Sequence, residues 1–254
     1  MEYINETIKI QLAHRTIREF KDETVPEEMI NQLIQVAGRT ATSNGLQACS
    51  IIRVTDIAVK KELADISKQE YVARVPELWI FIVDQYRNGR IAAEKDCHED
   101  SISDMDRFFQ GFTDACLMAQ NVVNAAESLG LGTVYFGSIL NDPSRTIKAM
   151  DLPKLTFPVL GLGFGYPNQE PQLKPRMDME LRMFENKYKC FDNYSELIKE
   201  YDEIMQTYYD LRQANKRVDS FSNQVVAKLK NINPVRQKII NNIIEQGFDI
   251  KLEK

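Results

Sequence analysis

Near the start of the chain, a short basic segment carries side chains that bind phosphate groups. It contains His14, Arg15, Thr16 and Arg18. Guanidinium groups bind phosphate oxygens through paired, charge-assisted hydrogen bonds worth roughly 1.5 to 3 kcal/mol each. On the first turn of a helix, Arg15 and Arg18 would project to one side because they are three residues apart. The segment therefore predicts a binding site for a polyanion. The alternative is that the arginines only form a face exposed to solvent.

A second basic cluster, Lys174 and Arg176, follows a glycine-rich segment at 161–167. The alternating glycines look like a dinucleotide-binding motif, but that motif needs a helix directly after them, because the pyrophosphate rests on the helix N-terminus. Pro167 and Pro171 follow instead, and prolines at this spacing exclude the helix. We therefore predict a strand on which the glycines leave one face as bare backbone.

The composition narrows the possible functions. The chain of 254 residues has 32 Lys and Arg against 37 Asp and Glu, a net charge of -5, which disfavours nucleic-acid or phosphopeptide binding. Four scattered cysteines without CxxC spacing favour a reducing compartment, and two histidines are too few for a histidine-rich metal site. The first residues do not resemble a secretory leader, and no apolar run reaches the roughly 20 residues that span a bilayer. We therefore expect a cytoplasmic protein with no metal, nucleic-acid partner or membrane span.

A polar loop is predicted between a helix and a strand in the first part of the chain. The helix begins near Glu27, and the strand covers residues 50–54. The apolar residues of the helix recur at helical spacing and are expected to be buried: Ile30, Leu33, Ile34 and Ala37. The loop carries Ser43, Asn44 and Gln47, which either donate hydrogen bonds to a ligand or simply form a turn.

The middle of the chain has the patterns of a protein core. The aromatic and β-branched run at 78–83 predicts a strand buried on both faces. Residues 115–126 are almost uncharged and predict a buried helix, Leu117 included, that stops near Gly130. Residues 131–138 then predict an extended segment whose glycines let the backbone approach a flat ligand.

Two amphipathic helices are predicted in the last part of the chain, at 194–211 and 234–245. The second has an apolar stripe of four isoleucines that needs a covering surface: Ile239, Ile240, Ile243 and Ile244. Packing on the same domain and packing on a second subunit both remain open.

Taken together and in this order, the motifs resemble the nitroreductase superfamily, in particular its NADPH-dependent flavin reductase and oxygen-insensitive nitroreductase branch. The resemblance covers nearly the whole chain. Four segments carry it: His14 to Phe20, the loop from Thr42 to Gln47, residues 125–132, and Gly161 to Gly163 leading to Lys174 and Arg176.

The resemblance implies an α+β fold with a central mixed, mostly antiparallel sheet flanked by helices. Residues 1–254 would form a single domain with 186–254 as a helical C-terminal excursion. It implies an intertwined homodimer with an extended C-terminal helical arm and FMN at the interface. The implied activity is a ping-pong reaction in which NADPH donates electrons and leaves before an acceptor binds. Flavins, nitro compounds and quinones are the implied small-molecule acceptors.

The resemblance also assigns roles to individual residues. The FMN phosphate would be held by His14, Arg15, Thr16, Lys174 and Arg176. The pyrimidine end of the flavin would face Arg18, the one residue with a catalytic role, because a cation there stabilises negative charge. The ribityl chain and ring edge would contact Ser43, Asn44, Gln47 and Gln69. The ring system would pack along the backbone of Tyr135, Phe136, Gly137 and Ser138. NADPH would meet Arg212, Lys216 and Arg217.

Two positions depart from the family pattern. Ser138 stands where relatives often have a second glycine, so its side chain could reduce the acceptor pocket. Gln213 stands where the NADPH-binding loop commonly begins with glycine, which could stiffen that loop. The alternative function is an FMN-binding sensor or storage protein with little turnover.

Overall fold

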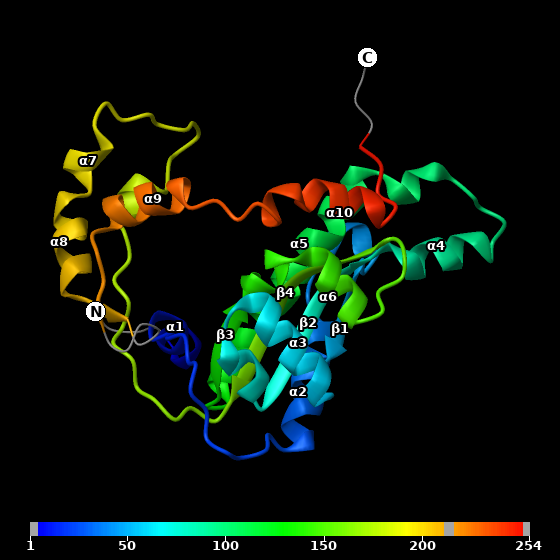
Figure 1. Cartoon of the computed structure of the whole chain (residues 1–254), viewed down its shortest axis with the longest axis horizontal. Coiled ribbons are helices and arrows are strands. Elements are labelled where there is room, and N and C mark those ends of the chain that lie inside the picture. Colours follow the sequence, from blue (N-terminus) through cyan, green and yellow to red (C-terminus); the bar gives the residue numbers. More distant parts are fainter. Residues whose placement is uncertain (1–4, 211–215, 251–254) are drawn as a thin grey trace. The chain divides into compact units, whose positions relative to one another are not determined.

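The computed structural model describes residues 5–210 and 216–250 (Figure 1). The chain divides into two compact units. The first comprises residues 1–169 together with 233–254, and the second comprises residues 170–232. Whether both units act as a single domain with a C-terminal excursion remains a prediction.

A four-stranded sheet is the centre of the first unit. Its strands are β1 (Cys49–Arg53), β2 (Glu77–Asp84), β3 (Gly132–Phe136) and β4 (Thr156–Gly165). They lie in the order β1-β2-β4-β3, and every neighbouring pair is antiparallel. A single parallel bridge joins Thr16 to Thr133 at the β3 edge. Helices flank the sheet, which confirms the predicted α+β class.

Strand β2 is buried on both faces, as its apolar run predicts. Every side chain from Leu78 to Val83 is at most 5 % exposed, because β2 lies between β1 and β4 and helices cover the sheet. Trp79 packs edge to face on Phe164 of β4, with 5.1 Å between ring centroids. Such aromatic pairs add to the burial energy that stabilises the sheet.

Helix α5 (Met105–Ser128) crosses one face of the sheet and contacts all four strands. It ends before Gly130, whose φ of 79° is the left-handed conformation that favours glycine. Leu117, predicted to be buried, is 50 % exposed, because the helix packs on the sheet with one side only. That part of the prediction was wrong.

Five further helices belong to the first unit, and four of them start at a side-chain cap. They are α1 (Glu6–Leu12), α2 (Glu27–Gly38), α3 (Ile57–Ser67), α4 (Gln85–Ala93) and α6 (Pro143–Ala149). Asp56, Asp84 and Asp142 accept backbone N–H groups at the starts of α3, α4 and α6, which satisfies donors that a helix start leaves unpaired. Helix α2 packs on α5, whereas α3 and α6 lie on the opposite face of the sheet (Figure 1). In α2 the predicted stripe is buried except for Ile34, which is 49 % exposed.

Helix α10 (Ile239–Glu245) returns to the first unit. Ile243 and the following Phe248 belong to its hydrophobic core, and Ile239 packs against that core. Ile240 and Ile244 stay about half exposed. The isoleucine stripe therefore packs in part on its own unit, the first of the two predicted possibilities.

The second unit is built from short helices. They are α7 (Tyr194–Leu197), α8 (Lys199–Thr207) and α9 (Phe221–Lys230), with a small hairpin of β5 (Tyr209–Asp210) and β6 (Lys216–Arg217). The single helix predicted at 194–211 was wrong, because the chain leaves helical geometry at Ile198 and the helix ends at Thr207. None of the helices in the described ranges has the length and apolarity to cross a membrane.

The four cysteines should differ in reactivity because their burial differs. Cys49 is buried, and burial, with a smaller contribution from Asp114, raises its thiol pKa to about 12. Cys97 and Cys190 are exposed. Since the thiolate is the nucleophile, we expect iodoacetamide at pH 8 to modify Cys97 and Cys190 within minutes and Cys49 only after unfolding in guanidinium. Peptide mass spectrometry would check this, and rapid modification of Cys49 in the folded protein would contradict the buried site.

Candidate functional site

The basic segment His14 to Arg18 lies along the edge of the sheet. Helix α1 ends at Leu12, and the Ile17 N–H donates to the Thr133 carbonyl of β3 at 2.9 Å. A Cβ on Gly132 would lie 2.6 Å from the Ile17 side chain, so only glycine permits this close approach. The segment is not helical, and the helical reason for placing Arg15 and Arg18 on one side was therefore wrong.

His14 is paired with a carboxylate of α5. Its Nδ1 lies 2.7 Å from Glu127 Oε1, and the Thr133 hydroxyl donates to the same oxygen at 2.6 Å. The side chains of His14 and Glu127 are 33 % and 12 % exposed. Three elements, the basic segment, α5 and β3, thus meet at one carboxylate oxygen.

Both arginines of the segment have an unused buried donor. Nε of Arg15 and Nε of Arg18 are buried without a hydrogen-bond partner, and only two other side-chain atoms in the described residues share this state, Ser67 Oγ and Gln169 Nε2. Buried polar atoms in native proteins nearly always have a partner. Two unpaired guanidinium nitrogens in one short segment therefore fit a site for an anionic or carbonyl-bearing ligand.

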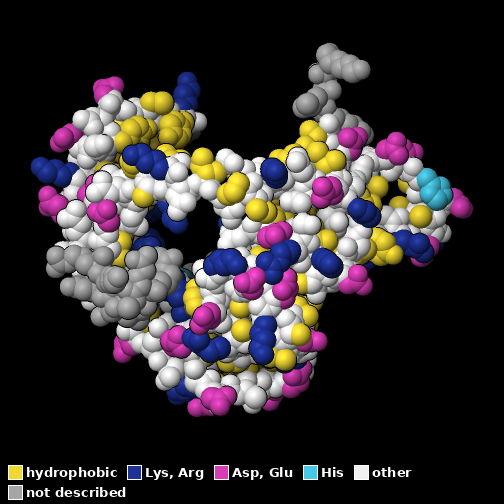
Figure 2. Space-filling view, viewed as in Figure 1, with side chains coloured by type: hydrophobic (Ala, Val, Ile, Leu, Met, Phe, Trp, Pro, Cys, Tyr) yellow, Lys and Arg dark blue, Asp and Glu magenta, His cyan; other side chains and the backbone are white. Residues whose placement is uncertain are grey.

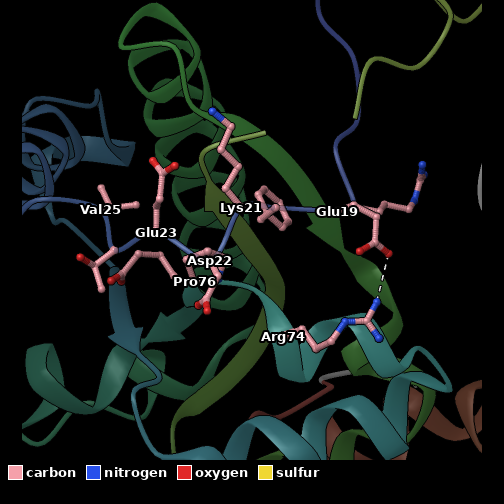
Figure 3. A pocket seen from close by; sticks show the side chains of 11 residues that line it. Glu19, Lys21, Asp22, Glu23, Val25, Arg74 and Pro76 are labelled. Carbon is pink, nitrogen blue, oxygen red and sulfur yellow. Dashed lines mark hydrogen bonds and ion pairs between the residues drawn. The ribbon is translucent and has the colours of Figure 1, made fainter. Parts of the chain in front are cut away.

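A pocket of about 400 Å³ opens beside Arg18 (Figure 3). It is lined by residues 18–25 on one side and by Arg74, Pro76 and Glu77 on the other. Arg74 donates to Glu19 at 3.0 Å, and Figure 3 shows these two side chains pointing toward each other. Because both are more than half exposed, this pair contributes little stability.

The loop that carries Ser43, Asn44 and Gln47 is held from the side of α5. Residues Ser43–Gly45 form a 3₁₀ turn, and both Asn44 and Gln47 have φ near 50°. Asp114 of α5, which is fully buried, accepts the Ser43 N–H at 2.8 Å and the Ala48 N–H at 3.2 Å. The carboxylate thereby fixes both ends of the loop.

Helix α4 holds the same loop at its carbonyl groups. Arg87 donates to the Gln47 carbonyl, and Asn88 donates to the Leu46 carbonyl at 3.0 Å. The exposed side chains of Asn44 and Gln47 are available to a ligand. That this loop and the basic segment bind the same cofactor remains a prediction.

The segment after β3 combines a buried ring with an open glycine. Phe136 is 1 % exposed, whereas a Cβ on Gly137 would meet nothing within 4 Å. The Ser138 hydroxyl donates to Gln69 Oε1 at 3.1 Å, so the serine that departs from the family pattern contacts another predicted site residue. Tyr135 donates to Gln120 at 3.2 Å, and burial, aided by Glu127, raises the pKa of its phenol well above the usual value.

The glycines of β4 do not leave a bare face. A Cβ on Gly161 or Gly163 would crowd the Phe136 ring, and one on Gly165 would lie 2.6 Å from Pro76. The predicted strand is present, but side chains of the same unit fill the space that the glycines provide. These glycines are therefore needed for packing.

The remaining predicted residues lie in the second unit. Arg176 donates to the Lys174 carbonyl at 3.1 Å. Lys216 and Arg217 form strand β6, and Arg212 lies outside the described residues. That these cations bind the same ligand as the basic segment, or bind NADPH, remains a prediction.

Two functional candidates were missed by sequence reasoning, Asp114 and Glu127. Asp114 is the last charged residue before the almost uncharged half of α5, and a carboxylate on the buried side of a helix signals a specific partner. Glu127 lies within a motif that the family resemblance includes, but only the fold places it beside His14. In the described part of the chain, no group of three or more His, Cys, Asp or Glu could hold a metal ion.

Charged side chains are interspersed on the face of the molecule seen in Figure 2. Lys and Arg lie among Asp and Glu there, without a continuous basic stripe. This distribution fits the net charge of -5. On this face, a nucleic acid would find no extended cationic surface.

Comparison with known proteins gives two family matches and many similar chains. Residues 12–166 match the model described as Nitroreductase family, and residues 174–251 match that of its C-terminal domain. The chain is 36 % identical to the oxygen-insensitive NADPH nitroreductase of Salmonella typhimurium, over 95 % of this chain and 98 % of that protein. It is 33 % identical to the FMN reductase (NADPH) of Bacillus subtilis, over 97 % and 99 %.

A solved structure agrees with these matches. The NADPH:FMN oxidoreductase from Vibrio harveyi, complexed with NAD+, superposes with a TM-score of 0.84 at 32 % identity. The match covers 96 % of this chain and 98 % of that one. The similarity thus extends over both compact units and over the sheet that positions the basic segment.

Proposed function

The chain belongs to the nitroreductase family, and on that premise we propose that it is an NADPH-dependent oxidoreductase that binds FMN. Its substrates would be small electron acceptors such as flavins, nitro compounds or quinones. The observation that carries the proposal is the pair of buried, unpartnered Nε atoms of Arg15 and Arg18, at the position where the family resemblance puts the flavin.

The residues present fit FMN. His14, Arg15 and Thr16 would hold its phosphate, joined by Lys174 and Arg176 of the second unit. Gln69 and the loop residues Ser43, Asn44 and Gln47 would contact the ribityl chain and ring edge, and the backbone of Tyr135 to Ser138 would pack along the ring system. Gly137, with open space at its Cβ position, would let the ring approach the backbone.

When bound, FMN supplies the redox chemistry, since flavins accept and pass on hydride equivalents. The residues of the chain would then bind and orient FMN and stabilise negative charge on its ring. Arg18, one of the residues that line the pocket described above, would place a positive charge at the pyrimidine end of the ring, where a preorganised cation favours negative charge. No side-chain acid or base is assigned. Arg212, Lys216 and Arg217 would bind the additional phosphate of NADPH.

We also propose that the protein is a homodimer located in the cytoplasm. The second unit exposes large apolar side chains, among them Met183 and Leu229, each 74 % exposed, and exposed apolar surface of this kind often marks a subunit interface. All four cysteines are free, as in proteins of reducing compartments.

A visible spectrum of the purified protein, followed by anaerobic titration with NADPH and NADH, tests the function. We expect a flavin spectrum that bleaches with NADPH at lower concentration than with NADH. Colourless protein that takes up no FMN on reconstitution would overturn the proposal. Yellow protein that does not consume NADPH with a nitro compound, a quinone or free FMN would favour the sensor or storage function instead.

A further inference from the structure

Glu127 lies where a carboxylate is costly unless it has a cationic partner. It is largely buried, and it sits in the last turn of α5, where the negative end of the helix dipole disfavours an anion. Within the described residues, His14 is the one group within ion-pair distance of it. The same helix end favours a hydrogen-bond donor over an anion, so both features of this position suit an imidazole N–H directed at the carboxylate.

The geometry fixes which ring nitrogen of His14 carries a proton. An ionised carboxylate only accepts hydrogen bonds. Nδ1, which lies 2.7 Å from Glu127 Oε1, must therefore be a donor, and Nε2 is the nitrogen left for another partner. The phosphate dianion of FMN likewise only accepts, so Nε2 can bind that form only when the ring holds both protons.

Glu127 is the ionisable group that orients the His14 ring. On β3, burial, aided by Glu127, raises the pKa of Tyr135. Helix α1, which packs on α5, has Glu6 and Lys9 paired with each other at 3.4 Å on the surface.

We propose that Glu127, held by the Thr133 hydroxyl, is the positioning residue of His14: it fixes Nδ1–H toward itself and presents Nε2–H to the phosphate of FMN. The phosphate part rests on the proposed function, whereas the Glu127–His14 part does not. Thr133 serves the arrangement twice, because its hydroxyl holds Glu127 and its carbonyl holds the Ile17 N–H.

Long-range proton–nitrogen NMR spectra of the cofactor-free protein test the pair directly. With only two histidines in the chain, the spectrum contains two imidazoles, and the exposed His98 is an internal reference. At pH 8.5 we expect neutral His14 to carry its proton on Nδ1, and Glu127→Gln to abolish this preference, since an amide can accept or donate. A wild-type His14 protonated on Nε2 would overturn the proposal even if FMN binds.

FMN affinity tests the consequence. Because Glu127 keeps the Nε2–H of His14 directed at the phosphate, Glu127→Gln is expected to bind FMN about tenfold more weakly at pH 7.5. Unchanged or tighter binding would overturn the proposal. Glu94→Gln, which changes an exposed glutamate directly after α4, is the matched control and should bind as wild type.

A second pair of variants keeps the test independent of how Glu127→Gln folds. Thr133→Val removes the hydroxyl that donates to Glu127, and we expect about threefold weaker FMN binding with broadened His14 signals. Thr133→Ser keeps the hydroxyl and should restore both. Equal behaviour of the Val and Ser variants would contradict the proposed arrangement. Protein that binds no FMN in any form would refute the proposed function, and the NMR result would still decide on the pair.

Discussion

Arg15→Ala is expected to purify without colour, whereas Arg18→Ala is expected to stay yellow and turn over slowly. The proposed site gives the two guanidinium groups different partners. Arg15 would bind the FMN phosphate, and loss of one or two charge-assisted hydrogen bonds of roughly 1.5 to 3 kcal/mol each weakens FMN binding by about 100-fold. Arg18 would act at the ring, where loss of one preorganised charge lowers turnover by about 10² to 10³.

Flavin content after gel filtration, fluorescence titration with FMN, and NADPH consumption in steady state would separate the two effects. Arg90→Ala, which changes an exposed arginine on α4, should leave all three at wild-type values. Full flavin content in Arg15→Ala would remove Arg15 from the phosphate site. Unchanged turnover together with unchanged flavin content in Arg18→Ala would remove Arg18 from the mechanism.

The elements of the fold that could be predicted from the sequence are those with one dominant local signal. Strand β2 is apolar from Leu78 to Val83 because both of its faces are covered, and α5 is recognisable because almost no charge interrupts its second half. The prolines after β4 correctly exclude a helix behind the glycines. In each case residues that are neighbours in sequence share the same environment. The pattern of apolar and charged residues along the chain therefore indicates that environment.

Predictions failed where a distant contact determined the conformation. The His14 to Arg18 segment was expected to begin a helix, but its hydrogen bond to Thr133 and the space left by Gly132 keep it extended along β3. The faces of α2 and α5 were predicted too broadly, since Ile34 and Leu117 are about half exposed. Periodicity shows that a helix is amphipathic but gives the width of the buried stripe poorly.

The candidate site residues also divide into those that a local sequence motif indicates and those that depend on a distant contact. The cations proposed for the site come from a family motif, whereas Asp114 and Glu127 act on partners 71 and 113 residues away in sequence. No local pattern can reveal such a pairing. Carboxylates inside an apolar helix are nevertheless a usable signal, because burial without a partner is too costly to persist.

Replacement of Asp114 with alanine is expected to destabilise the protein by about 3 to 5 kcal/mol. The buried carboxylate accepts two backbone N–H groups, from Ser43 and Ala48, and a buried donor left unpaired costs about 1 to 3 kcal/mol. No water can easily replace it, because α5 approaches closely here: a Cβ on Gly111 would lie 2.6 Å from the Ala48 carbonyl. For a chain of this size the loss corresponds to a fall in Tm of about 10 °C.

Thermal unfolding followed by circular dichroism would measure the effect, and FMN titration below the new Tm would show whether the loop of Ser43 and Gln47 still binds. Asp114→Asn keeps one carbonyl acceptor and should lose about half as much stability. Asp106→Ala, on the exposed side of the same helix, should cost at most about 1 kcal/mol. If Asp114→Ala proved as stable as Asp106→Ala, the two hydrogen bonds could not be what fixes the loop, and the loop would have to be held by Arg87 and Asn88 alone.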